Sequence, residues 1–184
     1  MTRADERLRK AVFFDRDGVL VREIVRGGRP YAPRTLDEFH ILPEAGRCLA
    51  YLRERDFLLI VVTNQPDVAR GAMSATVLDA MHARLASELP LDEIVVCRCL
   101  EADEGCACYK PRPGMLLEAA DRWKVSLEDS YMVGDRWRDI GAGRAAGCRT
   151  IFLDHGYSTD PRPDRPDHVV TSLTEACALI VGGP

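Results

Sequence analysis

Short apolar runs of strand length alternate along the chain with stretches whose apolar residues recur at helical spacing. The run Phe57–Val62 is continuous and partly β-branched, which is typical of a strand buried on both faces of a sheet. Alternating strands and helices favour an α/β fold with a Rossmann-like parallel sheet flanked by helices. Further strands are expected at Ala11–Phe14, Glu93–Val96, Ser130–Val133 and Arg149–Leu153, with a short edge strand at Val169–Val170.

Capping signals place helices between these strands. Ser74 can cap a helix that runs towards Glu88, Pro113 suits a first helical turn, and Gly147 can end a helix. Ser172 and Glu175 have the spacing of a capping box. The other helices are expected at Glu44–Arg55, Met115–Trp123 and Trp137–Ala146, and loops at Gly18–Pro43 and Asp160–Asp167. Residues 1–184 are expected to form one domain that acts as a monomer.

Composition and charge exclude several classes of protein. Hydrophobic residues make up 46% of the chain and charged residues 29%, which is typical of a globular protein. The net charge of −4 argues against nucleic acid as a partner. No apolar run approaches the roughly 20 residues that span a bilayer. The charged start at Met1–Arg7 is not followed by the apolar region of a signal peptide. A cytoplasmic protein without a membrane partner is therefore expected.

Polar and charged residues follow the expected strands at the point where each strand ends. The carboxyl ends of parallel strands meet at one edge of a sheet, where ligands bind. We therefore expect the following residues to converge: Asp15 and Asp17 after the first strand, Thr63 after the second, Asp135 after the fourth, and Lys110 from the segment before that strand. The only Asn and the only Gln of the chain, Asn64 and Gln65, follow Thr63 and are a further candidate pair, and Asp139 is expected to lie behind the other acids.

Carboxylates gathered in this way repel one another unless a cation lies between them, and hard oxygen ligands suit Mg²⁺. A hydroxyl, a lysine and backbone amides beside the metal can stabilise the charge on a transferring phosphoryl group. The predicted chemistry is phosphoryl transfer. A solvated loop residue is the ordinary alternative for any single Asp, but it does not account for several such groups in order at strand ends.

The order and spacing of these residues resemble the motifs of the haloacid dehalogenase superfamily. The matching segments are Asp15-x-Asp17-Gly-Val, Thr63, Lys110-Pro and Gly134-Asp135-x-x-x-Asp139. Four segments are more narrowly similar to the heptose-1,7-bisphosphate 7-phosphatase family and its histidinol-phosphatase relatives: Phe14–Gly18, Val62–Gln65, Ala69–Gly71 and Lys110–Gly114.

The resemblance implies a Mg²⁺-dependent phosphate monoester hydrolase. Phosphatases of this superfamily often carry a separate cap domain, but the gaps between the motifs of this chain leave no room for one. It implies that Asp15 is the nucleophile that forms an aspartyl-phosphate, and that Asp17 is first the general acid and then the base. The metal ligands would be Asp15, the Asp17 backbone carbonyl and Asp135. Thr63 and Lys110 would hold the phosphoryl oxygens.

The resemblance also implies a sugar bisphosphate substrate, with the 7-phosphate of heptose 1,7-bisphosphate as the leading choice. The family usually carries Arg directly before the motif Lys, where this chain has Tyr109. A histidinol-phosphate phosphatase and a catalytically inactive, zinc-stabilised binding module remain alternatives. The expected substrate-binding residues are Arg16, Glu23, Arg26, Asn64, Gln65, Tyr109 and Arg136, with Arg70 and Arg112 also suited to an anion.

Four cysteines form two Cys-x-Cys pairs, at Cys97, Cys99, Cys106 and Cys108. Four close thiols suit a closed tetrahedral Zn²⁺ site with a structural role, and two disulfides or inert thiols are the alternatives. Zinc-containing members of the resembling family carry Cys-x-His followed by Cys-x-Cys here, so Cys99 stands where His is usual. The four histidines show no metal-ligand spacing and are expected to be structural or exposed. Cys48, Cys148 and Cys177 are expected to be small buried hydrophobic residues.

Overall fold

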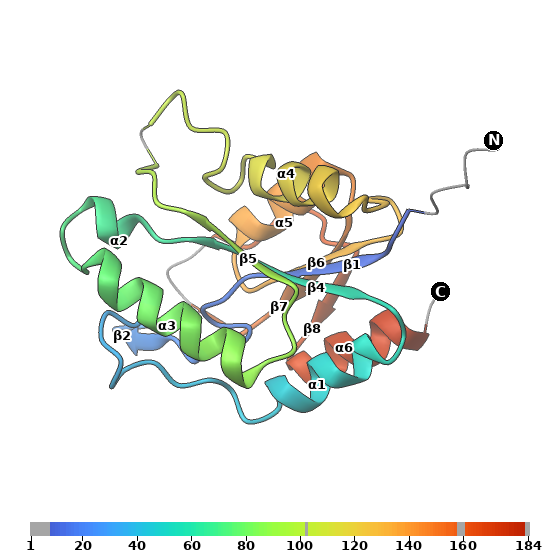
Figure 1. Ribbon diagram of the computed structural model, residues 1–184, viewed down its shortest axis with the longest axis horizontal. Helices are drawn as coiled ribbons and strands as arrows, with labels where there is room; N and C mark the ends of the chain where they lie inside the picture. Colours follow the sequence, from blue (N-terminus) through green and yellow to red (C-terminus); the bar gives the residue numbers. More distant parts are fainter. Residues whose placement is uncertain (1–7, 102, 158–160, 183–184) are drawn as a thin grey trace.

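The computed structural model describes residues 8–101, 103–157 and 161–182. Its larger sheet has six parallel strands in the order β5-β4-β1-β6-β7-β8 (Figure 1). This confirms the predicted α/β fold, and each predicted strand is present. The strands are β1 Ala11–Phe14, β4 Leu58–Asn64, β5 Glu93–Cys97, β6 Tyr131–Gly134, β7 Arg149–Leu153 and β8 His168–Val170.

Strand β1 lies inside the sheet, between β4 and β6, and all four of its side chains are buried. Its residues alternate between the two faces, with Val12 and Phe14 in one apolar core and Ala11 and Phe13 in the other. The carboxyl end of β1 is therefore fixed by packing on both faces, and Asp15 follows directly from it.

Helices cover both faces of the sheet (Figure 1). One core packs α1 Ala45–Arg53, α3 Ala75–Glu88 and α6 Leu173–Gly182 against the sheet. The opposite core packs α4 Gly114–Trp123 and α5 Trp137–Ala146. Within the part of the chain that the structure describes, no helix is long and apolar enough to cross a membrane.

Most capping predictions are confirmed, with small differences. The Ser74 Oγ accepts from the Val77 N–H at 3.2 Å, and Gly147 ends α5 with a φ of +90°. The Ser172 Oγ accepts from the Glu175 N–H as a capping box requires, but the Glu175 carboxylate accepts from the N–H of Thr171, one residue early. Pro113 lies at the N-cap of α4 rather than inside its first turn.

The predicted loop Gly18–Pro43 contains an antiparallel hairpin that the sequence reading missed. Its strands are β2 Ile24–Arg26 and β3 Arg29–Tyr31. Gly27 and Gly28 have φ values of +58° and +75° and form the two-residue turn. This Gly-Gly pair was the signal that could have revealed the hairpin. Among the described residues the helices and strands between β1 and β4 are this hairpin and α1.

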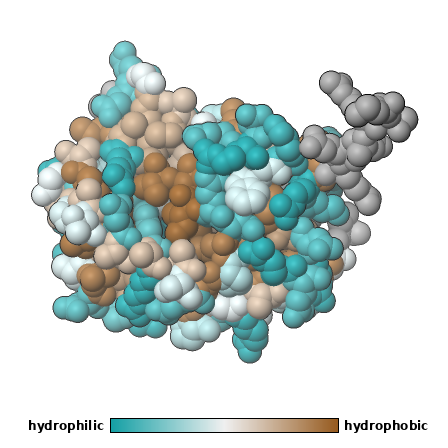
Figure 2. All heavy atoms as spheres, viewed as in Figure 1, coloured by the Kyte–Doolittle hydropathy of each residue, from teal (hydrophilic) through white to brown (hydrophobic). Residues whose placement is uncertain are grey.

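Two further differences concern the β4 end of the sheet. Strand β4 continues to Asn64 instead of ending at Val62, and a short helix, α2 Pro66–Ala69, follows it. The edge strand β5 is half-buried at Ile94–Val96, and apolar atoms reach the surface over this region in the face shown in Figure 2.

The charged start at residues 1–7 and the first residue of the predicted loop Asp160–Asp167 lie outside the described residues.

Candidate active site

A pocket of about 290 Å³ opens at the carboxyl ends of β1 and β4. Asp15, Asp17 and Lys110 line it, as the sequence predicted, and Asp139 lines it as well, whereas Asp135 does not. A wider, mostly apolar groove of about 500 Å³ runs along α5, but it holds none of the predicted site residues. The chemistry therefore belongs to the smaller, charged pocket.

Lys110 is 2% exposed and makes three polar contacts at the base of this pocket. Its Nζ lies 2.8 Å from Asp15 Oδ1 and 2.6 Å from Asp139 Oδ1, and it donates to the Val62 carbonyl oxygen at 2.8 Å. Burial alone would lower the pKa of Lys110, but the Asp139 and Asp15 carboxylates raise it above its ordinary value. Lys110 is therefore a permanent cation that orients Asp15.

Asp135 follows β6 and is 2% exposed. Neither of its carboxylate oxygens has a hydrogen-bond partner among the described residues, and the Arg136 Nε lies 3.5 Å from Oδ2. Burial, followed by the charges of Asp139 and Asp15, raises the pKa of Asp135 well above its ordinary value. A buried carboxylate in this condition needs a cation beside it.

The surroundings of Asp135 fit a small hard cation. Oxygen atoms from the carboxylates of Asp15, Asp135 and Asp139 lie within 4.8 Å of one another, and Lys110 occupies one oxygen of Asp139. Gly18 has a φ of +83°, and a Cβ at this position would lie 2.3 Å from Asp135 Oδ2. Glycine thus keeps the space beside Asp135 open.

Asp17 lines the pocket, and its carboxylate binds Arg16, which does not line the pocket. The Arg16 Nε and Nη2 donate to the two Asp17 carboxylate oxygens at 3.0 and 2.9 Å. Arg16 was expected to bind substrate, but its side chain is 0% exposed and it does not line the pocket. The bidentate pair with Asp17 and the contact with His82 hold the guanidinium inside the protein.

The Asn64–Gln65 pair lies at the pocket, as predicted, but both amides already bind protein groups. Asn64 accepts from the Lys110 N–H at 3.1 Å and donates to the Lys110 carbonyl oxygen at 3.2 Å. Gln65 Nε2 donates to Asp17 Oδ2 and to Thr63 Oγ1, both at 2.9 Å. These two residues therefore hold Lys110, Asp17 and Thr63 in place. Thr63 is 1% exposed and is itself not a lining residue.

The predicted residues of the pocket wall divide into two groups. Glu23, Tyr109 and Arg136 line the pocket. Arg26 does not, because it extends from the hairpin with 66% of its side chain exposed, 3.7 Å from Glu38. Arg112 is also absent from the wall and donates instead to the carbonyl oxygens of Asp103 and Cys106.

Three arginines that the sequence reading did not select line the pocket with the expected Arg70: Arg29, Arg34 and Arg138. Arg34 and Arg70 share the single carboxylate of Asp67, at 2.7 and 3.3 Å. The hairpin brings Arg29 and α5 brings Arg138, so only the folded chain places them together. In the sequence they are three of many arginines, without a local signal.

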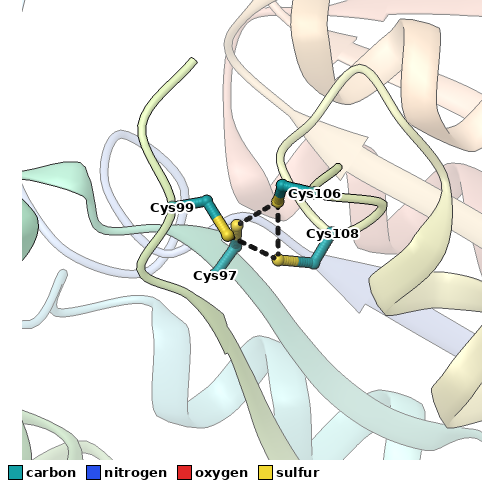
Figure 3. A group of neighbouring side chains, drawn as sticks. All are labelled: Cys97, Cys99, Cys106 and Cys108. Atoms are coloured by element: carbon teal, nitrogen blue, oxygen red, sulfur yellow. Dashed lines mark hydrogen bonds between the residues drawn. The ribbon is translucent and has the colours of Figure 1, made fainter. Parts of the chain in front are cut away.

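The four cysteines of the β5–α4 segment converge, as predicted (Figure 3). Sulfur–sulfur distances are 3.7 Å for Cys97–Cys106 and for Cys99–Cys108, and 3.2 Å for Cys106–Cys108. All four thiols are free, which excludes disulfides in this state. A tetrahedral ion with Zn–S bonds of about 2.3 Å places its sulfurs about 3.8 Å apart, so the cluster fits Zn²⁺.

The fold and this pocket define a haloacid dehalogenase-like hydrolase, and a family model described as HAD-hydrolase-like matches residues 107–176. The chain is 36% identical to D-glycero-beta-D-manno-heptose-1,7-bisphosphate 7-phosphatase of Pseudomonas aeruginosa, over 80% of this chain and 83% of that protein. The corresponding alpha-heptose enzyme of Campylobacter jejuni is 32% identical, over 78% and 81% of the two chains.

A solved structure agrees with these relatives. The D,D-heptose 1,7-bisphosphate phosphatase of B. bronchiseptica, complexed with magnesium and phosphate, matches with a TM-score of 0.76 and 30% identity, over 94% of this chain and 98% of that one. The chain therefore belongs to the heptose-1,7-bisphosphate 7-phosphatase family of haloacid dehalogenase-like phosphatases.

Proposed function

We propose that this protein is a Mg²⁺-dependent phosphatase that removes the 7-phosphate of a heptose 1,7-bisphosphate. The observation that carries the proposal is the base of the pocket, where Lys110 holds Asp15 close to the unsatisfied carboxylate of Asp135. The named activities of the relatives support the choice of substrate.

Asp15 and Asp135 are the side chains that would hold Mg²⁺, together with the Asp17 backbone carbonyl. Bound there, the ion supplies positive charge to the phosphoryl oxygens. The open space at Gly18 and the raised pKa of Asp135 support this assignment.

Asp15 is the nucleophile in this proposal. Its carboxylate oxygen bonds to phosphorus as the phosphorus–sugar oxygen bond breaks, which gives an aspartyl-phosphate. Water then attacks the same phosphorus and releases Asp15. Lys110 already uses its three donors on Asp15, Asp139 and the Val62 carbonyl, so it contributes orientation and charge.

Asp17 is the acid–base group. It gives a proton to the sugar alkoxide as that group leaves, and it takes a proton from water in the second step. Its place in the pocket wall and its hydrogen bond from Gln65 support this role.

The arginines of the pocket rim would bind the second phosphate of the substrate. We define the rim as Arg29, Arg34, Arg70 and Arg138, which face two nearby carboxylates, Asp67 and Glu101. The four guanidinium groups outnumber the two carboxylates with which Arg34, Arg70 and Arg138 form ion pairs. This excess suits a phosphate dianion, and it would take the place of the Arg that the family resemblance leads us to expect at the position of Tyr109.

We further propose that Cys97, Cys99, Cys106 and Cys108 hold a structural Zn²⁺. Cys108 lies two residues before Lys110, so a metal there would fix the segment that carries the lysine. The Tyr109 N–H already donates to Cys106 Sγ at 3.3 Å, which ties the cluster to the pocket wall.

The test is phosphate release from a panel of phosphorylated sugars and histidinol phosphate, with and without Mg²⁺. Turnover of the alpha or beta heptose bisphosphate, dependent on Mg²⁺, is the expected result. Preference for histidinol phosphate would assign the other phosphatase activity, and no turnover of any substrate would favour a binding module. Size-exclusion chromatography and cell fractionation would test the predicted monomer and its cytoplasmic location.

A further inference from the structure

Arg16 is the largest side chain that the structure buries completely. Burying a guanidinium is costly unless its donors are satisfied. Here the Nε and Nη2 donate to Asp17, and the Nη1 lies 3.0 Å from the Nε2 of His82. The Arg16 guanidinium carbon also lies 5.5 Å from the centre of the Phe39 ring. Arg16 is thus held in one orientation from several directions.

His82 serves Arg16 as a neutral acceptor. A guanidinium can only donate, so the His82 Nε2 must accept and the ring proton must lie on Nδ1. Burial, followed by the positive charge of Arg16, lowers the pKa of His82 to about 4, so the ring stays neutral at neutral pH. His82 is part of α3, which packs on the sheet through Leu78, Met81 and Leu85. The sheet-packed helix therefore fixes the Arg16 side chain.

The donors around Asp17 leave one position on its carboxylate open. An ionised carboxylate offers about four lone-pair positions, two on each oxygen. Arg16 occupies one position on Oδ1 and one on Oδ2, and Gln65 occupies the second position on Oδ2. Among the described contacts, only one position on Oδ1 remains for a proton.

We propose that Arg16, fixed by His82, is a positioning residue that with Gln65 makes Asp17 exchange its proton at Oδ1. This inference rests on the proposed acid–base role of Asp17. The proton leaves Oδ1 for the sugar oxygen as its bond to phosphorus breaks. In the second step Oδ1 accepts a proton from the water whose oxygen bonds to phosphorus, while the Asp15–phosphorus bond breaks. Arg16 and Gln65 donate throughout and change no proton.

The experiment compares two substrates in the Arg16→Gln variant. A sugar phosphate needs a proton on its leaving oxygen, whereas 4-nitrophenyl phosphate releases a weakly basic phenolate that does not. The value of kcat/KM reports the steps through phosphorylation of Asp15. We expect Arg16→Gln to lower kcat/KM for heptose bisphosphate by about 30- to 100-fold, mainly through kcat, and that for the aryl phosphate by less than about 3-fold.

Two substitutions at His82 provide a second, independent measurement. His82→Gln keeps an acceptor for Arg16 and should retain activity within about 3-fold of wild type on both substrates. His82→Leu removes the acceptor and should show the same substrate selectivity as Arg16→Gln, with a loss of about 10-fold on the sugar phosphate. The matched control is Arg122→Gln, an exposed arginine of α4 that lies in ion pairs with Glu93 and Glu118.

Equal losses on both substrates in Arg16→Gln and His82→Leu, or no loss on the sugar phosphate in either, would overturn the inference. Should Arg16→Gln fail to fold, as judged by its thermal unfolding, the His82 pair decides. If the wild-type protein itself releases no phosphate, the proposed function fails. If the wild type is active and the substrate selectivity does not change in the variants, only the positioning role fails.

Discussion

The carboxylate cluster at the edge of the sheet and the cysteine cluster of the β5–α4 segment both gather metal-ligating side chains, but they differ in how those side chains are satisfied. The four cysteines are joined by three sulfur–sulfur contacts of 3.2–3.7 Å and surround a common centre (Figure 3). In the cluster of Asp15, Asp135 and Asp139, by contrast, Asp15 and Asp139 border a pocket, and the two oxygens of Asp135 have no described donor. A closed ligand set stabilises a loop, whereas an open one keeps room for a reactant.

The largest effect on activity is expected in the carboxylate cluster. Asp15→Asn removes the proposed nucleophile and should reduce turnover by at least about 10⁴-fold, which is about 5 kcal/mol of transition-state stabilisation. The fold should persist, because Asn fills the same space at the end of β1. Phosphate release and thermal unfolding measure the two effects. Asp121→Asn, an exposed substitution on α4, is the matched control, and near-wild-type turnover in Asp15→Asn would disprove the mechanism.

At the cysteine cluster we expect a substitution to lower the stability of the fold more than the catalytic rate. Cys106→Ser removes one of the four proposed ligands and should release the proposed zinc, which would close a twelve-residue segment from Cys97 to Cys108. A cross-link over such a segment is worth about 3 kcal/mol. Metal analysis and urea unfolding measure the loss, with Cys148→Ala as the control outside the cluster. If wild-type protein purified without a chelator contains no zinc, the proposed zinc site is wrong.

A smaller effect of opposite sign is expected at Asp135. Its raised pKa means that the folded protein binds this proton more tightly than the unfolded chain. The stability that this provides is present below the ordinary carboxylate pKa and is lost as the pH rises through the folded-state pKa. Asp135→Asn should therefore stabilise the magnesium-free protein by about 2 kcal/mol at neutral pH.

Thermal unfolding of the wild type and of Asp135→Asn between pH 5 and 8 measures this effect. Mg²⁺ should stabilise the wild type increasingly as the pH rises, because the ion competes with the proton on Asp135. It should not stabilise Asp135→Asn. A magnesium effect that is equal in both proteins would place the ion elsewhere.

The smallest effect is expected at the rim. Arg138 pairs with Glu101 at 2.5 Å and remains partly exposed, so solvent screens its charge. Arg138→Gln should raise KM for a heptose bisphosphate by about 5-fold, near 1 kcal/mol, and should change kcat little. A monophosphate of the same sugar should show no such change. An equal rise in KM for both substrates would contradict binding of the second phosphate at the rim.

The part of the site that follows the strands could be predicted from the sequence. Apolar runs locate β1, β4 and β6, and the residues after a parallel strand must reach the carboxyl edge of the sheet. This rule placed Asp15 and Asp135 correctly. Two Cys-x-Cys pairs in one short segment likewise predicted the cysteine cluster, because thiols so close in the chain meet with little loss of entropy.

The direction of each side chain could not be predicted in the same way. Arg16 stands between two pocket-lining aspartates in the sequence, yet it turns inward to His82, which lies 66 positions away. Asn64 and Gln65 were recognised as site residues, but their partners were not. Arg29 and Arg138 enter the pocket from a hairpin and from α5, and no local pattern marks them.

The sequence by itself determined the parallel sheet, the order of the catalytic segments and the four clustered cysteines, because hydrophobic period and strand ends are local properties of the chain. Only the tertiary structure decided that Lys110 holds Asp15 across 95 positions and that Arg16 supports Asp17 instead of facing the substrate. These contacts depend on which buried charges find partners once the helices pack, and that energy belongs to the whole fold rather than to any one segment.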